Sequence, residues 1–224
     1  YAFEDGGTTK ALTTAGTYDI KNAAAIKPRT ITLDLLKKTG IDKTYDGNAD
    51  VLAADKTFGT NFGYAEGTAA ENQLVPGDGS SITATAAAYA TKTGHTERAQ
   101  DVYRGTAASG EAESNGKNVV YTIGLAGTNA DTNYVLSYGT ATPASSVTMT
   151  GTGTITPKKL TLTSTSKVTR GYNGGSDASA SLLDGKHTLD GKISGDTIAL
   201  NTGTGTTITG TYYKDATKAE KAVN

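Results

Sequence analysis

Cysteine is absent from the 224 residues of the chain. Its absence excludes disulfides, thiolate nucleophiles and thiolate metal sites from the chemistry of the protein. A chain without thiols is also compatible with export to an oxidising compartment. Other reactive or bulky residues are scarce, since the chain has two His, one Met, three Phe and no Trp.

Charge of one sign is also lacking. The formal net charge is −1 and no basic cluster exceeds a few residues. Nucleic acid and anionic membranes are therefore poor candidate partners. The sequence has no apolar run of about 18 residues, which predicts no membrane insertion. It also has no signal peptide, and it begins with Tyr1 and not with Met. We interpret that beginning as the product of processing or as part of a longer protein.

Glycine, threonine and tyrosine dominate what remains, with 28 Gly and 12 Tyr against only four Pro. Threonine interspersed with Val, Ile and Tyr favours strands and disfavours helices, because β-branched side chains are stiff at χ1. The apolar fraction is only 36%. The composition therefore predicts an all-β protein made of thin, two-layer units.

One turn motif occurs twice. Tyr45, Asp46 and Gly47 are matched 127 positions later by Tyr172, Asn173 and Gly174. Asp and Asn side chains bond the backbone two residues on, and Gly accepts the positive φ of a tight turn. We predict that both are structural turns, each fixed by its tyrosine. Because the flanks recur as well, the chain is predicted to be a repeat array.

The flanking signals keep the same order in both copies. Pro28 and Pro157 lie 129 positions apart, and each precedes a strand with alternating apolar residues. Ile31, Leu33 and Leu35 form the apolar face of the first strand, and Leu160 and Leu162 that of the second. The dipeptide Gly77-Asp78, before a strand with Ile82, Ala84 and Ala86 on one face, is matched by Gly195-Asp196.

These spacings predict three segments. Residues 1–27 are the closing segment of a preceding repeat, and they include a short strand at Gly16–Ile20. Residues 28–154 form one complete repeat, and residues 155–224 form the first part of a following repeat. Short helices are expected only at Ala65–Gln73 and Asp215–Ala222.

The chain resembles the YDG-type and related MBG repeats of very large bacterial surface proteins, many of them filamentous-haemagglutinin-like adhesins. The resemblance covers nearly the whole chain and rests on the order and spacing of short motifs. These are Lys43–Gly47, Tyr89–Gly94, Leu125–Gly127, Asn133–Leu136 and Ile155–Thr161. It implies an exported module displayed on the bacterial cell surface, and no catalytic or cofactor residues come with it.

For the fold we predict tandem antiparallel β-sandwich modules of Ig-like architecture. The alternative is a β-grasp-like module, in which one helix crosses the sheet. The joint between the modules is expected to be short and fairly stiff, because Pro157 is the only residue there that interrupts the strands.

Candidate chemistry is sparse. Asp46, Asn48 and Asp50 place oxygens at alternate positions, as calcium loops do, but the terminal bidentate Glu is missing. A structural turn is the favoured interpretation of this stretch. His95 and His187 have no nucleophile motif near them and are expected on the surface. Internal Lys–Asn or Thr–Gln crosslinks are a further hypothesis, made by analogy with surface pilins and adhesins, and the sequence does not locate one. We predict that the protein is not an enzyme and has no cofactor.

The resulting functional hypothesis is a structural or adhesive repeat module of an extracellular bacterial surface protein. Its expected partners are neighbouring repeats or copies of itself, together with host or cell-surface glycans or proteins. The alternative is a subunit of a self-assembling filament or surface layer. In that case residues 1–26 of one molecule would complete the half-repeat 155–224 of the next by strand addition.

Overall fold

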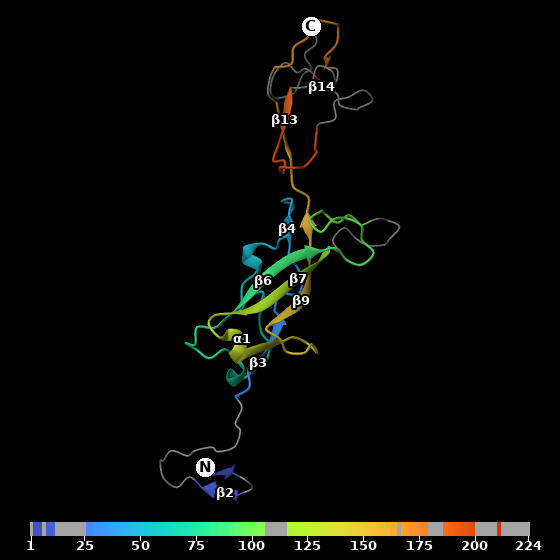
Figure 1. Cartoon of the computed structure of the whole chain (residues 1–224). Coiled ribbons are helices and arrows are strands. Elements are labelled where there is room, and N and C mark those ends of the chain that lie inside the picture. Colours follow the sequence, from blue (N-terminus) through green and yellow to red (C-terminus); the bar gives the residue numbers. More distant parts are fainter. Residues whose placement is uncertain are drawn as a thin grey trace.

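The computed structural model describes residues 2–5, 8–11, 26–105, 116–164, 167–178, 186–199 and 210–211. These residues are mostly strand with little helix, arranged in several small sheets (Figure 1). The all-β prediction is therefore confirmed at that level. The expected strand at Gly16–Ile20 and the expected helix at Asp215–Ala222 lie outside the described residues.

The strands between residues 29 and 153 form two three-stranded sheets, with β4 (Lys43–Thr44) outside them. The first has the order β5-β3-β8 and consists of Phe62–Tyr64, Arg29–Leu35 and Tyr134–Ser137. The second has the order β6-β7-β9 and consists of Ser81–Ala90, Lys117–Ala126 and Ser146–Gly153. Side chains from both sheets form one core cluster, which contains Ile31, Phe62, Tyr121, Leu136 and Met149. We call residues 26–156 the first module.

Not every strand pair is antiparallel. Strand β3 pairs with β8 in parallel, and β4 (Lys43–Thr44) pairs in parallel with β10 (Ile155–Thr156). About a hundred residues separate the members of each pair, so the chain has the length that a crossover between parallel strands needs. The prediction of purely antiparallel modules is wrong in this respect.

The alternation predicted for β3 is confirmed, because Ile31, Leu33 and Leu35 are each at most 1% exposed. The face predicted for β6 is only partly right. A register shift lies between Ala84 and Ala86, so the buried face moves from Ile82 to Ala87 and Tyr89, and Ala86 is exposed. A bulge inserts one residue and thereby exchanges the two faces of the strand.

Within the described residues, helical structure is confined to short turns. A 3₁₀ turn at Ala53–Asp55 (η1) and another at Ala70–Asn72 (η2) accompany one four-residue helix, α1, at Ala130–Asn133. The helix expected over Ala65–Gln73 is therefore reduced to its second half. Gly67 within it has a φ of +77°, which ends any right-handed helix at that point.

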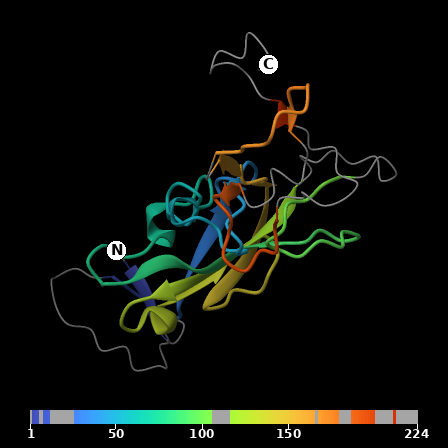
Figure 2. The same cartoon turned by 90° about the horizontal axis from the view of Figure 1, so that it is seen from above.

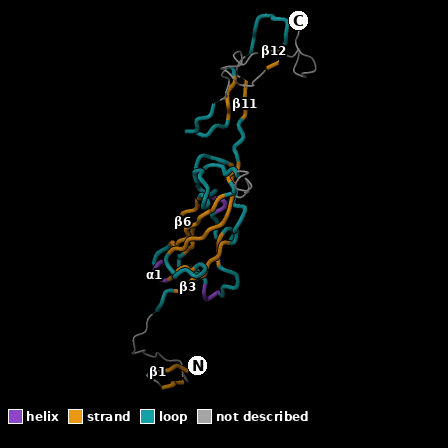
Figure 3. The backbone as a smooth tube through the Cα atoms, turned by 90° about the vertical axis from the view of Figure 1, so that its right-hand side faces the viewer, coloured by secondary structure: helices purple, strands orange, loops and turns teal. Residues whose placement is uncertain are grey.

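Residues beyond Pro157 form smaller pairs. Strand β11 (Thr161–Ser164) pairs with β13 (His187–Asp190), and β12 (Asp177–Ala178) pairs with β14 (Gly210–Thr211). Two further strands, β1 (Ala2–Asp5) and β2 (Thr8–Ala11), form a hairpin at the other end of the chain. We call the described residues after Pro157 the second module, and it continues the long axis of the first (Figures 1 and 3).

The boundary between the modules is not a loose linker. Ile155 is 1% exposed and belongs to the core cluster of the first module, although the repeat pattern assigns it to the following one. Its neighbours on β9 approach the segment 38–41 closely, with hydrogen bonds from Thr152 N to Lys38 O (2.9 Å) and from Ile41 N to Thr152 O (3.4 Å). Figure 2, which looks from above, shows the strands of both sheets beside one another in the first module.

Gly153 permits this approach. A Cβ added there would lie 1.8 Å from the carbonyl oxygen of Ile41. We expect Gly153→Ala to lower the free energy of unfolding by about 1–3 kcal/mol, because the backbone must shift to make room. The matched control is Gly171→Ala, where a Cβ meets nothing within 4 Å. Urea denaturation of both variants measures the difference, and equal midpoints would contradict this account.

Candidate functional site

The Tyr-Asp-Gly turn of the first module is built around a buried lysine. Lys43 lies on β4, and its side chain is 1% exposed. Its Nζ donates to Asp46 Oδ1 at 2.7 Å, to Asn48 Oδ1 at 3.0 Å, and to the carbonyl oxygens of Asn48 and Asp50, both at 2.9 Å. Three N–H groups are thus shared among four oxygens. The turn is a cage for an ammonium group that the chain itself supplies.

The backbone of the turn is shaped by consecutive side-chain hydrogen bonds. Asp46 Oδ1 accepts from Asn48 N at 3.2 Å, and Asn48 Oδ1 accepts from Asp50 N at 2.8 Å. Gly47 between them has a φ of +86°, a conformation that favours glycine. This local chemistry turns the oxygens of Asp46 and Asn48 inward, toward Lys43.

Tyr89 on β6 covers the ammonium. Lys43 Nζ lies 5.4 Å from the centroid of the tyrosine ring, a cation–π distance. The Tyr89 hydroxyl donates to Ile41 O at 2.7 Å, and Tyr89 N donates to Ala49 O at 2.7 Å. Burial raises the pKa of this hydroxyl well above its ordinary value, so it remains a donor. The turn is thereby attached to the second sheet.

The three positions considered for calcium are thus brought together, but around a different cation. Asp46 and Asn48 give side-chain oxygens to the ammonium, whereas Asp50 gives its backbone carbonyl. Among the described residues no group of three or more His, Cys, Asp or Glu could hold a metal ion. The alternating oxygens that resemble a calcium loop are accounted for by Lys43.

Proximity of lysine and asparagine also bears on a crosslink. Lys43 Nζ is 3.0 Å from Asn48 Oδ1, which is the contact that a Lys–Asn amide would need. The same nitrogen is ion-paired with Asp46 at 2.7 Å. An ammonium in an ion pair has no lone pair with which to attack the amide carbon, so the geometry favours a cage of hydrogen bonds.

The carboxyl of Asp46 is tuned by this cage. Partial burial alone would raise its pKa. The hydrogen bonds from Lys43 and from Asn48 N, together with the charge of Lys43, outweigh that effect and hold the pKa below the ordinary value. The turn is therefore most stable with Asp46 ionised.

A second copy of the cage lies at the second turn. Arg170 occupies the position three residues before Asn173, as Lys43 does before Asp46. Its guanidinium donates to Asn173 Oδ1 and to the carbonyl oxygen of Gly175. Gly174 has a φ of +80°, close to that of Gly47. Both predicted structural turns thus hold a basic side chain, which the turn motif alone did not indicate. The recurring basic residue was the signal available in the sequence.

The first turn also contacts the second module. The Tyr45 hydroxyl donates to Asp196 Oδ1 at 2.8 Å, and Tyr45 N donates to Thr156 O at 2.8 Å. A Cβ added to Gly47 would lie 2.6 Å from Ile193 Cγ2, so the first turn touches the second module at Ile193. The hydrogen bond to Asp196 raises the pKa of the Tyr45 hydroxyl. We call the contacts of Tyr45, Gly47 and Ile155 with their partners the module joint.

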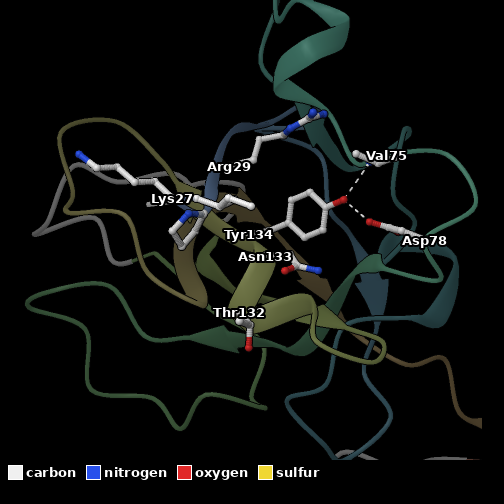
Figure 4. A pocket seen from close by; sticks show the side chains of 9 residues that line it. Lys27, Arg29, Val75, Asp78, Thr132, Asn133 and Tyr134 are labelled. Atoms are coloured by element: carbon white, nitrogen blue, oxygen red, sulfur yellow. Dashed lines mark hydrogen bonds between the residues drawn. The ribbon is translucent and has the colours of Figure 1, made fainter. Parts of the chain in front are cut away.

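The opposite end of the first module carries an open pocket of about 620 Å³ (Figure 4). Tyr134 stands in its wall, where its hydroxyl donates to Asp78 Oδ2 and accepts from Val75 N at 3.1 Å. The hydrogen bond from Tyr134 lowers the pKa of Asp78. The remaining lining residues are Ile26, Lys27, Pro28, Arg29, Thr132 and Asn133.

The histidines do not form a catalytic group in the described residues. The ring of His95 stacks on Tyr103, with centroids 4.0 Å apart, and its side chain is only 7% exposed. The expectation of a surface histidine is therefore wrong for His95, because an aromatic partner covers it. His187 lies on β13, far along the chain from the first. Glu97, 3.8 Å from His95, accepts from buried Lys117 at 2.7 Å.

Comparison of the chain with protein-family models, curated proteins and solved structures finds no match. The resemblance to YDG-type repeats is thus carried by the motifs alone. No helix in the described residues is long and apolar enough to span a membrane.

Removing the ammonium should destabilise the first module. Lys43→Met leaves four oxygens without their donor, and we expect a loss of about 2–3 kcal/mol in the free energy of unfolding. The matched control is Lys38→Met. Lys38 is ion-paired with Asp34 at 3.0 Å but is 62% exposed, and its loss should leave the free energy of unfolding almost unchanged. Chemical denaturation compares the two, and an equal cost would show that the cage contributes nothing.

The lowered pKa of Asp46 makes a pH-dependent prediction. Its stabilising contribution is present above the unfolded pKa of about 4 and is lost as the pH falls through the lower folded value. We therefore expect Asp46→Asn, which copies Asn173, to be less stable than the parent at pH 7. The difference should narrow below about pH 4. Urea midpoints at both pH values test this, and a difference that grows in acid would reverse the assignment.

Proposed function

We propose that this chain is a structural and adhesive repeat module of a secreted bacterial surface protein, serving as a stalk spacer or in attachment. The observation that carries the proposal is the module joint. Strand β10 pairs with β4, and Ile155 lies in the core of the first module. Tyr45 of the first module bonds Asp196 of the second. A joint of this kind holds consecutive modules in line and transmits their orientation along an array.

The fold of each module is proposed to be an Ig-like β-sandwich. Support comes from the two three-stranded sheets that share one core cluster. A β-grasp-like module needs a helix that crosses its sheet. The longest α-helix of the described residues, α1 (Ala130–Asn133), has four residues and is too short for that purpose. The sandwich is therefore the better account of the first module.

Location and partners follow from the same proposal. The resemblance to surface adhesins and the absence of cysteine support an extracellular position on the bacterial surface. Neighbouring repeats are the primary partners, and host or cell-surface glycans or proteins are the candidate ligands for attachment. We propose neither an enzymatic activity nor a cofactor.

A self-assembling filament or surface layer is the second candidate, favoured by one observation. Strand β3 has partners on both edges, β5 and β8, whereas β11 pairs only with β13 within the described residues. Leu162 on β11 is 51% exposed, although its counterpart Leu33 is 1% exposed. An added strand would supply what β11 lacks. The segment proposed to provide it, within residues 1–26, lies mostly outside the described residues.

The module joint can be tested with a pair of engineered cysteines. A Cβ at position 47 would lie 3.9 Å from Ile193 Cβ, within the range of a disulfide. We expect Gly47→Cys/Ile193→Cys to form an intramolecular disulfide without changing the maximum dimension measured by small-angle X-ray scattering. The control pair is Gly94→Cys/Ile193→Cys. If the disulfide forms but the maximum dimension becomes smaller than that of the parent, the joint is hinged. That result would remove the support for a stiff spacer.

Two further measurements separate the candidates. Antibody labelling of intact cells of the source organism should detect the protein if it is displayed on the surface. Sedimentation velocity over a wide concentration range distinguishes a spacer from a filament subunit. A monomer at every concentration favours the spacer, and growing polymers favour the filament.

A further inference from the structure

The module joint has an equivalent set of residues at the opposite end of the first module. The joint uses Ile155, Ile193 and Asp196 to receive the Tyr45 turn. Their counterparts in the repeat pattern are Ile26, which precedes Pro28 as Ile155 precedes Pro157, and Val75 and Asp78, which belong to the first Gly-Asp turn. These three counterparts line the pocket of Figure 4.

The apolar residues of this set are more exposed than their counterparts at the joint, and the difference is largest for the isoleucine. Ile155 is 1% exposed because it lies in the core cluster of the first module, whereas Ile26 is 101% exposed. Val75 is 42% exposed. Its counterpart Ile193 is partly buried. Apolar residues that are less exposed at one copy of a joint than at the other indicate a surface that a partner covers. We call Ile26, Val75 and Asp78 the receiving pole.

A matching turn is present at the second module. Tyr172, the counterpart of Tyr45, is 69% exposed, whereas Tyr45 is half-buried, packs against the core cluster of the first module and bonds Asp196 of the second. The Arg170 cage and the positive φ of Gly174 give this turn the shape of the first. The chain therefore carries both halves of a second joint, at opposite ends of the described structure.

We propose that the receiving pole binds the Tyr172-Asn173-Gly174 turn of a second copy of this chain. Tyr172 donates its hydroxyl to the carboxylate of Asp78, and Gly174 packs on Val75. Asp78 can accept this bond in addition to those from the Tyr134 hydroxyl and from Ser80 N, because an ionised carboxylate has about four acceptor positions. The contact is head-to-tail, so it propagates into a row of molecules and does not close as a dimer.

This inference rests on the proposed function, since it extends the same joint from neighbouring modules to neighbouring molecules. It differs from strand addition at β11 in the residues it uses. The association of two separate molecules is expected to be weak. The joint within one chain needs less affinity, because its two modules are held at an effective concentration on the order of millimolar. Covalent trapping is therefore the appropriate measurement.

The absence of native cysteine makes the trap specific. Gly174→Cys in one copy and Val75→Cys in a tagged second copy are mixed at high concentration in a thiol–disulfide buffer. Positions 174 and 75 are the counterparts of Gly47 and Ile193, which touch at the joint. We expect the mixed disulfide in several-fold excess over that of Gly94→Cys with Val75→Cys. Gly94 has a φ of +87° and open space around it, so it matches the strain of Gly174. Adding Tyr172→Ala to the first copy should reduce the yield to the control level.

Each outcome is decisive. A yield equal to that of the Gly94 control overturns the proposal, provided that circular dichroism shows both variants to be folded. The Gly47–Ile193 disulfide then tells whether the joint itself fails. If that disulfide forms and the intermolecular one does not, the spacer function stands and only the contact between copies is lost. A yield insensitive to Tyr172→Ala overturns the assigned geometry.

Discussion

Lys43 places a positive charge in the interior of a thin β module, and the free energy of removing it from water must be recovered locally. Four oxygens from three residues recover it, and the tyrosine ring of Tyr89 closes the remaining side. Because β4 carries the lysine and pairs with β10, the cage fixes the place where one module ends and the next begins. A small core with few aromatic residues is thus supplemented by one concentrated polar cluster.

The cage also explains why the turn tolerates variation. In the first copy Lys pairs with Asp, and in the second Arg pairs with Asn, so the combination changes while the geometry stays similar. A carboxylate with a compact ammonium gains Coulomb energy. A guanidinium with an amide relies on its planar array of donors. Both solutions satisfy the inward oxygens of the turn, which is the physical requirement that recurs.

Local patterns in the sequence predicted those features that depend on neighbouring residues. The buried face of β3 followed from the alternation of Ile31, Leu33 and Leu35, and both turns followed from their Asx-Gly chemistry. The register shift after Ala84 did not, because a bulge leaves no trace in hydropathy. The parallel pairs β3–β8 and β4–β10 join residues about a hundred positions apart, a separation over which periodicity carries no information. The stretch Asp46 to Asp50 was predicted to be a structural turn in preference to a calcium loop, but the turn chemistry did not show that its oxygens surround the ammonium of Lys43.

The burial of Ile155 in the core of the preceding module has a mechanical consequence. Tension applied along the array would pull β10 along β4 and draw this isoleucine out of the first module's interior. The hydrogen bonds between two parallel strands lie across such a pull, so they resist it together and are not opened one after another. If the chain works as the proposed stalk, the boundary between repeats would therefore bear the load. A module would have to begin to unfold there before its neighbour could be detached.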